Sequence, residues 1–144
     1  MIMMSAENRI VFFGKPACVN NRKQRKILKE AGADLIERDL LSYPWSESLL
    51  RQFFLDIPKD QWVNRSAPEI KSGRLNVDAL SEQQLLWTMV LNPGLIRRPL
   101  IAWQEQRWVG FDWSILQAEL PINAPDNRQW LNDDLESCAL VSKG

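Results

Sequence analysis

The pattern of apolar and polar residues over the first forty positions predicts a strand, a helix and a second strand. The apolar run in residues 9–13 (RIVFF) is typical of a strand that is covered on both faces. A basic helix runs from about Cys18 to Ala31 and ends at Gly32, since glycine adopts left-handed dihedral angles at little cost. Residues 34–39 (DLIERD) form a short second strand. This strand–helix–strand unit is short, which predicts a right-handed crossover between parallel strands.

The middle of the chain, about residues 42–95, predicts a helical insertion. Residues 44–46 (PWS) start a helix whose apolar residues recur at helical spacing. Ser81 and Gln84 match a capping box at the start of a later helix, which residues 92–94 (NPG) end. Shorter helical turns are expected near residues 58–64 and 68–73. No Gly/Ser-rich linker flanks this segment, so we interpret it as an insertion and not as a separate domain.

The last third of the chain predicts a β-hairpin and a closing helix. Residues 98–103 (RPLIAW) and 107–111 (RWVGF) indicate two antiparallel strands, and Asp112 can cap a helix that Pro121 ends. Residues from about 121 to 144 predict a weakly structured tail. The order βαβ, helical insertion, β-hairpin and α predicts a thioredoxin-like α/β fold with a four-stranded mixed sheet. We expect one such domain over residues 1–144.

In that layout the proline that starts the third strand lies beside the N-terminus of the first helix. We therefore expect a cis bond between Arg98 and Pro99, because a tight turn there requires one and only X–Pro bonds form it readily. This arrangement would bring Arg98 within reach of Cys18.

Composition narrows the class of protein. The 144 residues suffice for one domain with a real core, and eighteen basic and eighteen acidic side chains cancel. A neutral chain without an apolar run of membrane length predicts neither nucleic-acid nor membrane binding. The first residues do not match a signal peptide, so we expect a cytoplasmic protein. In such a reducing compartment we expect no structural disulfide between Cys18 and Cys138.

Missing residue types exclude several chemistries. There is no histidine, which removes Cys-His catalysis and imidazole metal sites. The chain has no CxxC and no glycine-rich phosphate-binding motif, and we expect no bound metal or cofactor. A phosphatase-type loop would need arginine six positions after the cysteine, where Gln24 stands. What remains is a single-cysteine site served by arginines.

Cys18 is the candidate reactive residue. At a helix N-terminus its sulfur would face unpaired N–H groups and the positive end of the helix dipole, which favour a thiolate. The basic residues of the following turns add positive charge. The alternative is a small buried apolar residue that happens to precede a solvated helix.

Several motifs resemble the arsenate reductase (ArsC/Spx) family of thioredoxin-fold proteins. They are residues 15–18 (KPAC), 95–101 (LIRRPLI) and 109–112 (VGFD). Residues 67–73 (APEIKSG) and 92–93 (NP) are most similar to the family's nitrogenase-associated branch. The likeness covers about Ile10 to Leu120.

The resemblance implies a set of site residues. Cys18 would attack an oxyanion such as arsenate, and Arg98, Arg107 and Arg65 would bind that anion. Guanidinium groups suit this task because they form paired hydrogen bonds with oxyanions. Asn21 and Pro99 would support the site, Asn21 by an amide N–H toward the sulfur.

Two functions follow. The first is a thiol oxidoreductase coupled to glutathione or glutaredoxin, with glutathione as co-substrate. The second is a non-catalytic accessory protein that binds a nitrogenase-related partner or an oxyanion. Asn21 stands where Spx regulators have the second cysteine of their CxxC switch, and the hydroxyl residue that arsenate reductases have near the cysteine is absent. Cys138 is a candidate resolving cysteine or an inert tail residue. The tryptophans of the insertion, Trp45, Trp62 and Trp87, are candidates for a partner-binding face or are core residues.

Overall fold

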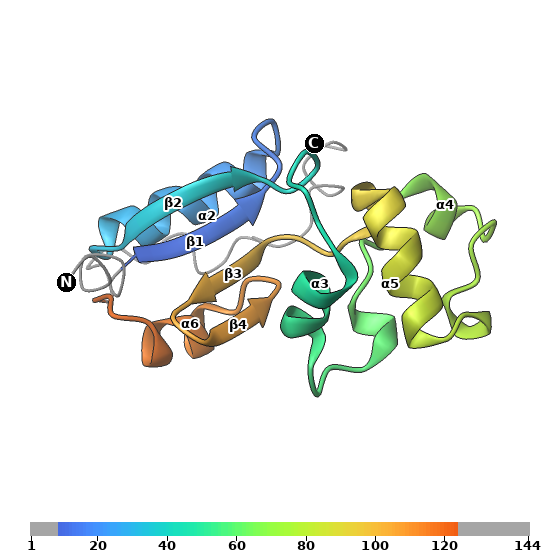
Figure 1. Cartoon of the computed structure of the whole chain (residues 1–144). Coiled ribbons are helices and arrows are strands. Elements are labelled where there is room, and N and C mark those ends of the chain that lie inside the picture. Colours follow the sequence, from blue (N-terminus) through green and yellow to red (C-terminus); the bar gives the residue numbers. More distant parts are fainter. Residues whose placement is uncertain (1–8, 124–144) are drawn as a thin grey trace.

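One mixed sheet organises the molecule (Figure 1). The computed structural model describes residues 9–123 and gives the sheet order β2-β1-β3-β4. Its strands are β1 (Arg9–Gly14), β2 (Asp34–Asp39), β3 (Leu100–Trp103) and β4 (Gln106–Val109). β1 and β2 are parallel, whereas β3 is antiparallel to both β1 and β4. The predicted thioredoxin-like α/β fold and its parallel crossover are confirmed.

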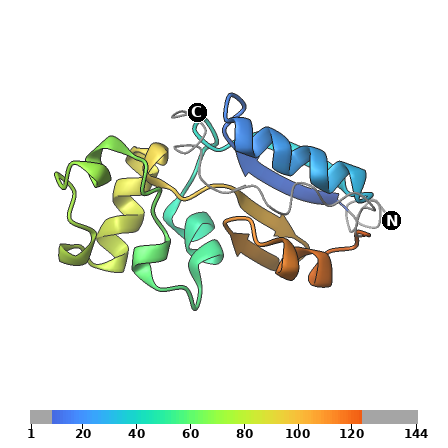
Figure 2. The ribbon, with the colours of Figure 1, turned by 180° about the vertical axis from the view of Figure 1, so that it is seen from behind.

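Two helices cover one face of this sheet, as the view from behind shows (Figure 2). They are α2 (Val19–Glu30) and α6 (Trp113–Glu119). Between them and the sheet lies an apolar cluster that includes Ile10, Phe12, Leu28, Ile101 and Leu116. The alternation of side chains along β1 sends Val11 and Phe13 to the opposite face.

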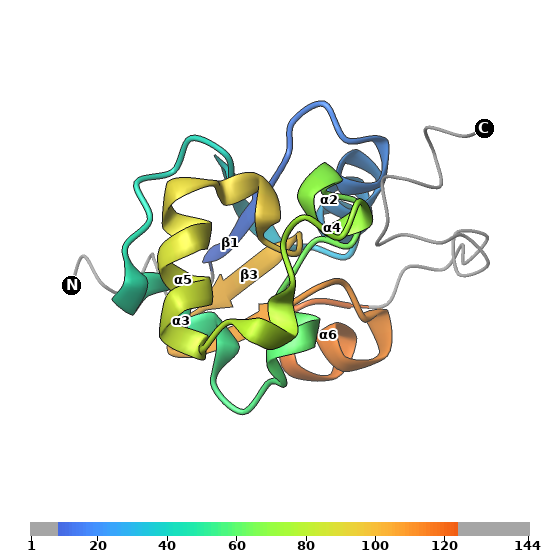
Figure 3. The same cartoon turned by 90° about the vertical axis from the view of Figure 1, so that its right-hand side faces the viewer.

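The chain between β2 and β3 is helical, in the position of the expected insertion (Figure 3). It contains α3 (Glu47–Phe54), η1 (Lys59–Gln61), α4 (Pro68–Lys71), η2 (Val77–Ala79), α5 (Glu82–Leu91) and η3 (Pro93–Leu95). These elements and the second sheet face share a larger apolar cluster, in which Trp45 and Trp62 are buried. Two of the three tryptophans considered for a partner-binding face are thus core residues, and Trp87 alone of them is exposed.

Local end signals were good predictors of the helix boundaries. Gly32 has φ +95° after α2, Ser81 and Gln84 form the expected capping box, and Asp112 caps α6. The hairpin strands begin and end elsewhere than predicted. β3 starts at Leu100, because Pro99 has no N–H to give to the ladder, and β4 ends at Val109, before Gly110 with φ +81°. The 3₁₀ turn η2 was not predicted.

Candidate functional site

The candidate site lies at one edge of the sheet, where β1 and β2 end and β3 begins. The Leu40 N–H donates to the Gly14 carbonyl at 2.9 Å, which holds the ends of the two parallel strands together. Phe13 is the register partner of Leu100, so the residues just before β3 reach the same edge. The Arg98–Pro99 bond is cis, as expected. The fold therefore brings Arg98 to the edge at which the loop carrying Cys18 leaves β1.

Cys18 is the N-cap residue of α2. Its backbone is extended, with φ −77° and ψ 123°, and its Sγ accepts the backbone N–H of Asn21 at 3.5 Å. The first turn of α2 contains no acidic residue that would oppose a negative charge on the sulfur. Cys18 is buried but belongs to neither apolar cluster. These surroundings, a helix N-terminus among polar groups, favour a thiolate over a thiol when the cysteine is reduced.

Three amide side chains form a buried polar layer beside the cysteine. Asn20, Asn21 and Gln24 are all fully buried. The Asn21 Oδ1 accepts the Lys15 N–H at 2.8 Å, and its Nδ2 donates to Gln24 Oε1 at 2.8 Å. It is the backbone N–H of Asn21, and not its side-chain amide, that reaches the sulfur. Asn21 thus fixes the loop that carries Cys18 to the first turn of α2.

Gly14 makes this arrangement possible. A Cβ at this position would lie 2.7 Å from Cε1 of Phe12 and 3.0 Å from Oδ1 of Asn21. The layer of Asn20, Asn21 and Gln24 was not predicted. The sequence did contain a signal for the burial of Gln24. Gln24 lies three residues before Ile27 and four before Leu28, and therefore on the helix face that meets the sheet.

Arg98 is the arginine that the fold places at this edge. Burial lowers the pKa of Arg98 from its ordinary value, because desolvation penalises the charged guanidinium. Its Nε is buried and donates to no acceptor among residues 9–123. A half-buried cation with a buried, unused donor is suited to an anionic ligand.

The guanidinium of Arg107 binds other residues, away from Cys18. Its Nη1 donates to the carbonyls of Gln104 and Gln106, both at 2.8 Å, and its Nη2 to Gln52 Oε1 at 3.3 Å. These partners lie at the β3–β4 turn and on α3. Arg107 pairs with Ala102 in mid-strand, and its guanidinium points to the hairpin turn, away from the edge of Cys18.

Arg65 is a surface residue. Its Nη2 donates to the Asp60 carbonyl at 2.9 Å and lies 3.8 Å from the Asp60 carboxylate. Of the three expected arginines, the structure thus brings Arg98 to the edge of Cys18, while Arg107 and Arg65 have partners of their own.

The oxidation state of the cysteine differs from the expectation. Cys18 is disulfide-bonded in the structure, so the expectation that it takes part in no disulfide is wrong there. That expectation rested on a reducing compartment, and a fold does not report its compartment. Cys138 lies outside the described residues, and its role as a resolving cysteine stays a prediction.

The described part of the chain contains neither a cluster of metal-ligating side chains nor a membrane-spanning helix. No group of three or more His, Cys, Asp or Glu side chains between residues 9 and 123 is arranged to hold a metal ion. In the same range no helix is long and apolar enough to cross a membrane.

Comparisons with known proteins give a consistent result. The model of the ArsC family matches residues 13–118 of this chain. An uncharacterized 15.7 kDa protein in the draG 3′ region of Rhodospirillum rubrum is 36% identical over 129 residues, which cover 90% of this chain and 87% of that protein. The global transcriptional regulator Spx of Bacillus subtilis is 25% identical over 114 residues, with 78% and 87% covered.

Solved structures share the fold. The arsenate reductase from Vibrio cholerae has a TM-score of 0.63 at 21% identity, covering 71% of this chain and 89% of that one. An arsenate reductase (ArsC) related protein from Brucella melitensis has a TM-score of 0.59 at 20% identity, with 77% and 93% covered.

Proposed function

This chain belongs to the ArsC family, a family with the character of thiol oxidoreductases. We therefore propose that it is an ArsC-like oxidoreductase with Cys18 as its reacting thiolate. The observation that carries the proposal is the position of Cys18 as the N-cap of α2, with its sulfur on the Asn21 N–H. Arg98 would supply the guanidinium that binds an anionic substrate. Glutathione or glutaredoxin would supply reducing equivalents, and we expect the reaction to take place in the cytoplasm.

The proposed chemistry with glutathione is thiol–disulfide exchange. The Cys18 thiolate attacks one sulfur of oxidised glutathione, a mixed disulfide forms, and one glutathione thiolate leaves. A second thiol, from glutathione or glutaredoxin, then attacks the glutathione sulfur and releases the Cys18 thiolate.

With arsenate, the thiolate would attack arsenic and displace hydroxide. A glutathione thiolate would next attack the Cys18 sulfur, so that the S–As electron pair stays on arsenic. Arsenic leaves as arsenite, reduced by two electrons, and Cys18 is left in a mixed disulfide that the second thiol resolves. An adjacent guanidinium stabilises both the bound oxyanion and the thiolate.

Glutathionylation of the reduced protein tests the proposal. After reduction and removal of the reductant, incubation with oxidised glutathione at pH 8 is expected to add one glutathione at Cys18, as followed by mass spectrometry. Cys138→Ser should retain this adduct and Cys18→Ser should lose it. If Cys18→Ser reacts as fast as the unmodified chain, Cys18 is not the reacting thiol and the proposal fails.

Substitution of Arg98 by methionine tests the anion site. Replacing this half-buried, partly desolvated cation by an apolar side chain of similar length is expected to leave the stability unchanged or to raise it. The unmodified, reduced chain should gain thermal stability in arsenate or phosphate, and Arg98→Met should not. Arg65→Met is the matched control, since Arg65 is exposed and paired with Asp60. If Arg65→Met alone removes the anion effect, Arg65 is the binding residue and the assignment of Arg98 is wrong.

The guanidinium of Arg107 binds Gln52 and the hairpin turn, so fewer cations are left to bind an oxyanion beside Cys18. This observation favours a second candidate function. This candidate is a non-catalytic accessory protein with a nitrogenase-related partner. The relative named for the draG 3′ region is compatible with it. A reduced Cys18 that stays unmodified in the glutathione experiment would favour this function.

A further inference from the structure

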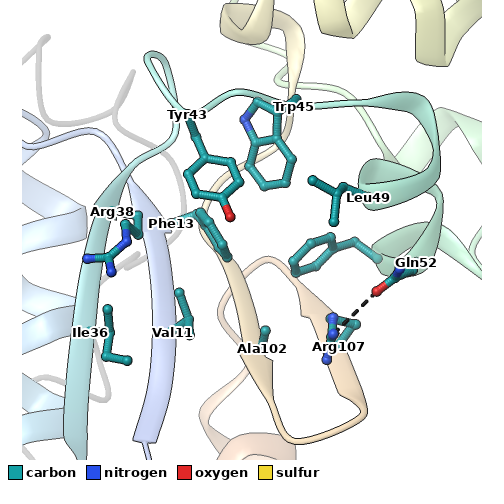
Figure 4. Close-up of a pocket in the computed structure, with 11 residues that line it drawn as sticks. Val11, Phe13, Ile36, Arg38, Tyr43, Trp45, Leu49, Gln52, Ala102 and Arg107 are labelled. Carbon is teal, nitrogen blue, oxygen red and sulfur yellow. Dashed lines mark hydrogen bonds between the residues drawn. The ribbon is translucent and has the colours of Figure 1, made fainter.

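A cavity of about 270 Å³ lies on the sheet face that α2 and α6 leave uncovered (Figure 4). The strand register defines its floor. Ile36 pairs with Val11, Val11 with Ala102, and Ala102 with Arg107, so one residue from each strand points to the same side. The floor is therefore a fixed row of side chains across the whole sheet, and it is separate from the edge that carries Cys18.

Aromatic rings form the walls. Phe13 lies with its ring centroid 4.9 Å from those of Tyr43 and Trp45 and 5.7 Å from that of Phe53. All three contacts are edge-on or tilted, which fixes the rings against each other. Such a preformed, mostly apolar hollow is the usual setting for a small organic ligand.

Two positively charged side chains border this apolar surface. Arg38 and Arg107 both line the cavity, on the β2 side and the β4 side respectively. No Asp or Glu among residues 9–123 forms an ion pair with either arginine. Of the two acidic neighbours of Arg38, Glu37 pairs with Arg25 and Lys29 of α2, and the Asp39 carboxylate accepts the Leu41 N–H.

Arg107 retains donors for a ligand. A guanidinium has five N–H groups, and three are used by Gln104, Gln106 and Gln52, which leaves two. Its position is fixed by those three bonds and by the Phe53 ring, whose centroid lies 5.7 Å from the guanidinium carbon. Two free donors on a fixed guanidinium can bind a carboxylate at little cost in side-chain entropy.

We propose that this cavity binds a small, planar organic carboxylate. Its carboxylate group pairs with Arg107 and its apolar body lies on Val11 and Ala102 against the Phe13 and Tyr43 rings. The volume is slightly below the usual range of ligand pockets and suits a body of one or two fused rings. An inorganic oxyanion would leave the aromatic walls unused. The site does not depend on the chemistry of Cys18.

Titration with 2-naphthoate tests this site, followed by calorimetry and by backbone amide shifts in NMR spectra. Saturable 1:1 binding is expected, with shifts in β1, β3, β4 and α3. The neutral analogue 2-naphthamide should bind about tenfold more weakly or worse, because it lacks the charge-assisted hydrogen bonds. Equal binding of the two probes, no binding of either, or shifts confined to the loop of Cys18 would overturn the proposal.

Variants locate the site independently. Ala102→Leu places a larger side chain on the cavity floor, and Arg107→Gln removes the charge; each should weaken 2-naphthoate binding about tenfold or more. Arg74→Gln removes an exposed arginine in the insertion and should change nothing. Because Arg107→Gln also removes hydrogen bonds from the hairpin turn, Ala102→Leu is the decisive variant if the other fails to fold. Undiminished binding by a folded Ala102→Leu chain would place the ligand elsewhere.

Discussion

Replacing Trp62 by alanine is expected to cost about 3–5 kcal/mol of unfolding free energy, the usual range for a buried aromatic residue. The side chain is 2% exposed and stacks on Phe54 with a centroid distance of 4.6 Å and an interplanar angle of 10°. Its indole N–H donates to the Ile57 carbonyl at 2.8 Å, so the substitution also leaves a polar group without its partner. Urea denaturation followed by far-UV circular dichroism measures the loss.

The consequences should reach the candidate site. The Trp62 carbonyl accepts the Arg97 N–H at 2.9 Å, and Val63 bridges Ile96, so this segment guides the chain into the cis Arg98–Pro99 bond. Trp87→Ala is the matched control, since Trp87 belongs to the same insertion but is 56% exposed. A change of about 0.5 kcal/mol or less is expected for it. Equal effects of the two substitutions would contradict the assignment of Trp62 to the core.

The fold was predictable because its signals are local. Gly32 and Asn92-Pro93-Gly94 end helices, and the Ser81–Gln84 pair starts one, through dihedral angles and hydrogen bonds that involve a few neighbouring residues. The order of elements then limits the sheet to few topologies. Strand ends were less predictable: the third strand was expected to begin at Arg98, yet it begins at Leu100, because Pro99 cannot donate to the ladder.

The parts of the candidate site that depend on the order of elements along the chain were predictable. The parts that depend on the direction of a side chain were not. Cys18 ends the β1 loop and Arg98 precedes β3, so sheet order alone brings both to one edge. The direction of Arg107 depends on its register with Ala102 and on Gln52, which belongs to an element far away in sequence. The same holds for Trp45 and Trp62, whose burial depends on how the insertion packs. No local pattern contains that information.

Asn21→Leu is expected to cost about 2–4 kcal/mol, because a part-buried and a buried group each lose a hydrogen bond, the buried one at about 1–3 kcal/mol. These are the Lys15 N–H and the Gln24 side-chain carbonyl, both 2.8 Å from the Asn21 amide. Leucine has the branching of asparagine but is larger, so strain in this tightly packed layer adds to the loss. Chemical denaturation of the reduced protein, in a Cys138→Ser background, measures the change.

Asn21→Asp separates the structural role of this side chain from its electrostatic one. Aspartate still accepts the Lys15 N–H, and the Gln24 amide, whose Nε2 has no acceptor among residues 9–123, can turn to donate to it. The stability loss should therefore be smaller than for leucine. A negative charge in the first turn of α2, however, opposes the thiolate and should raise the Cys18 thiol pKa by roughly one unit or more. The pH dependence of alkylation by iodoacetamide measures this, with Asn21→Leu as the uncharged comparison. If the aspartate variant alkylates like the unmodified chain, the sulfur is not ionised by the helix N-terminus, and the proposed reactivity of Cys18 loses its physical basis.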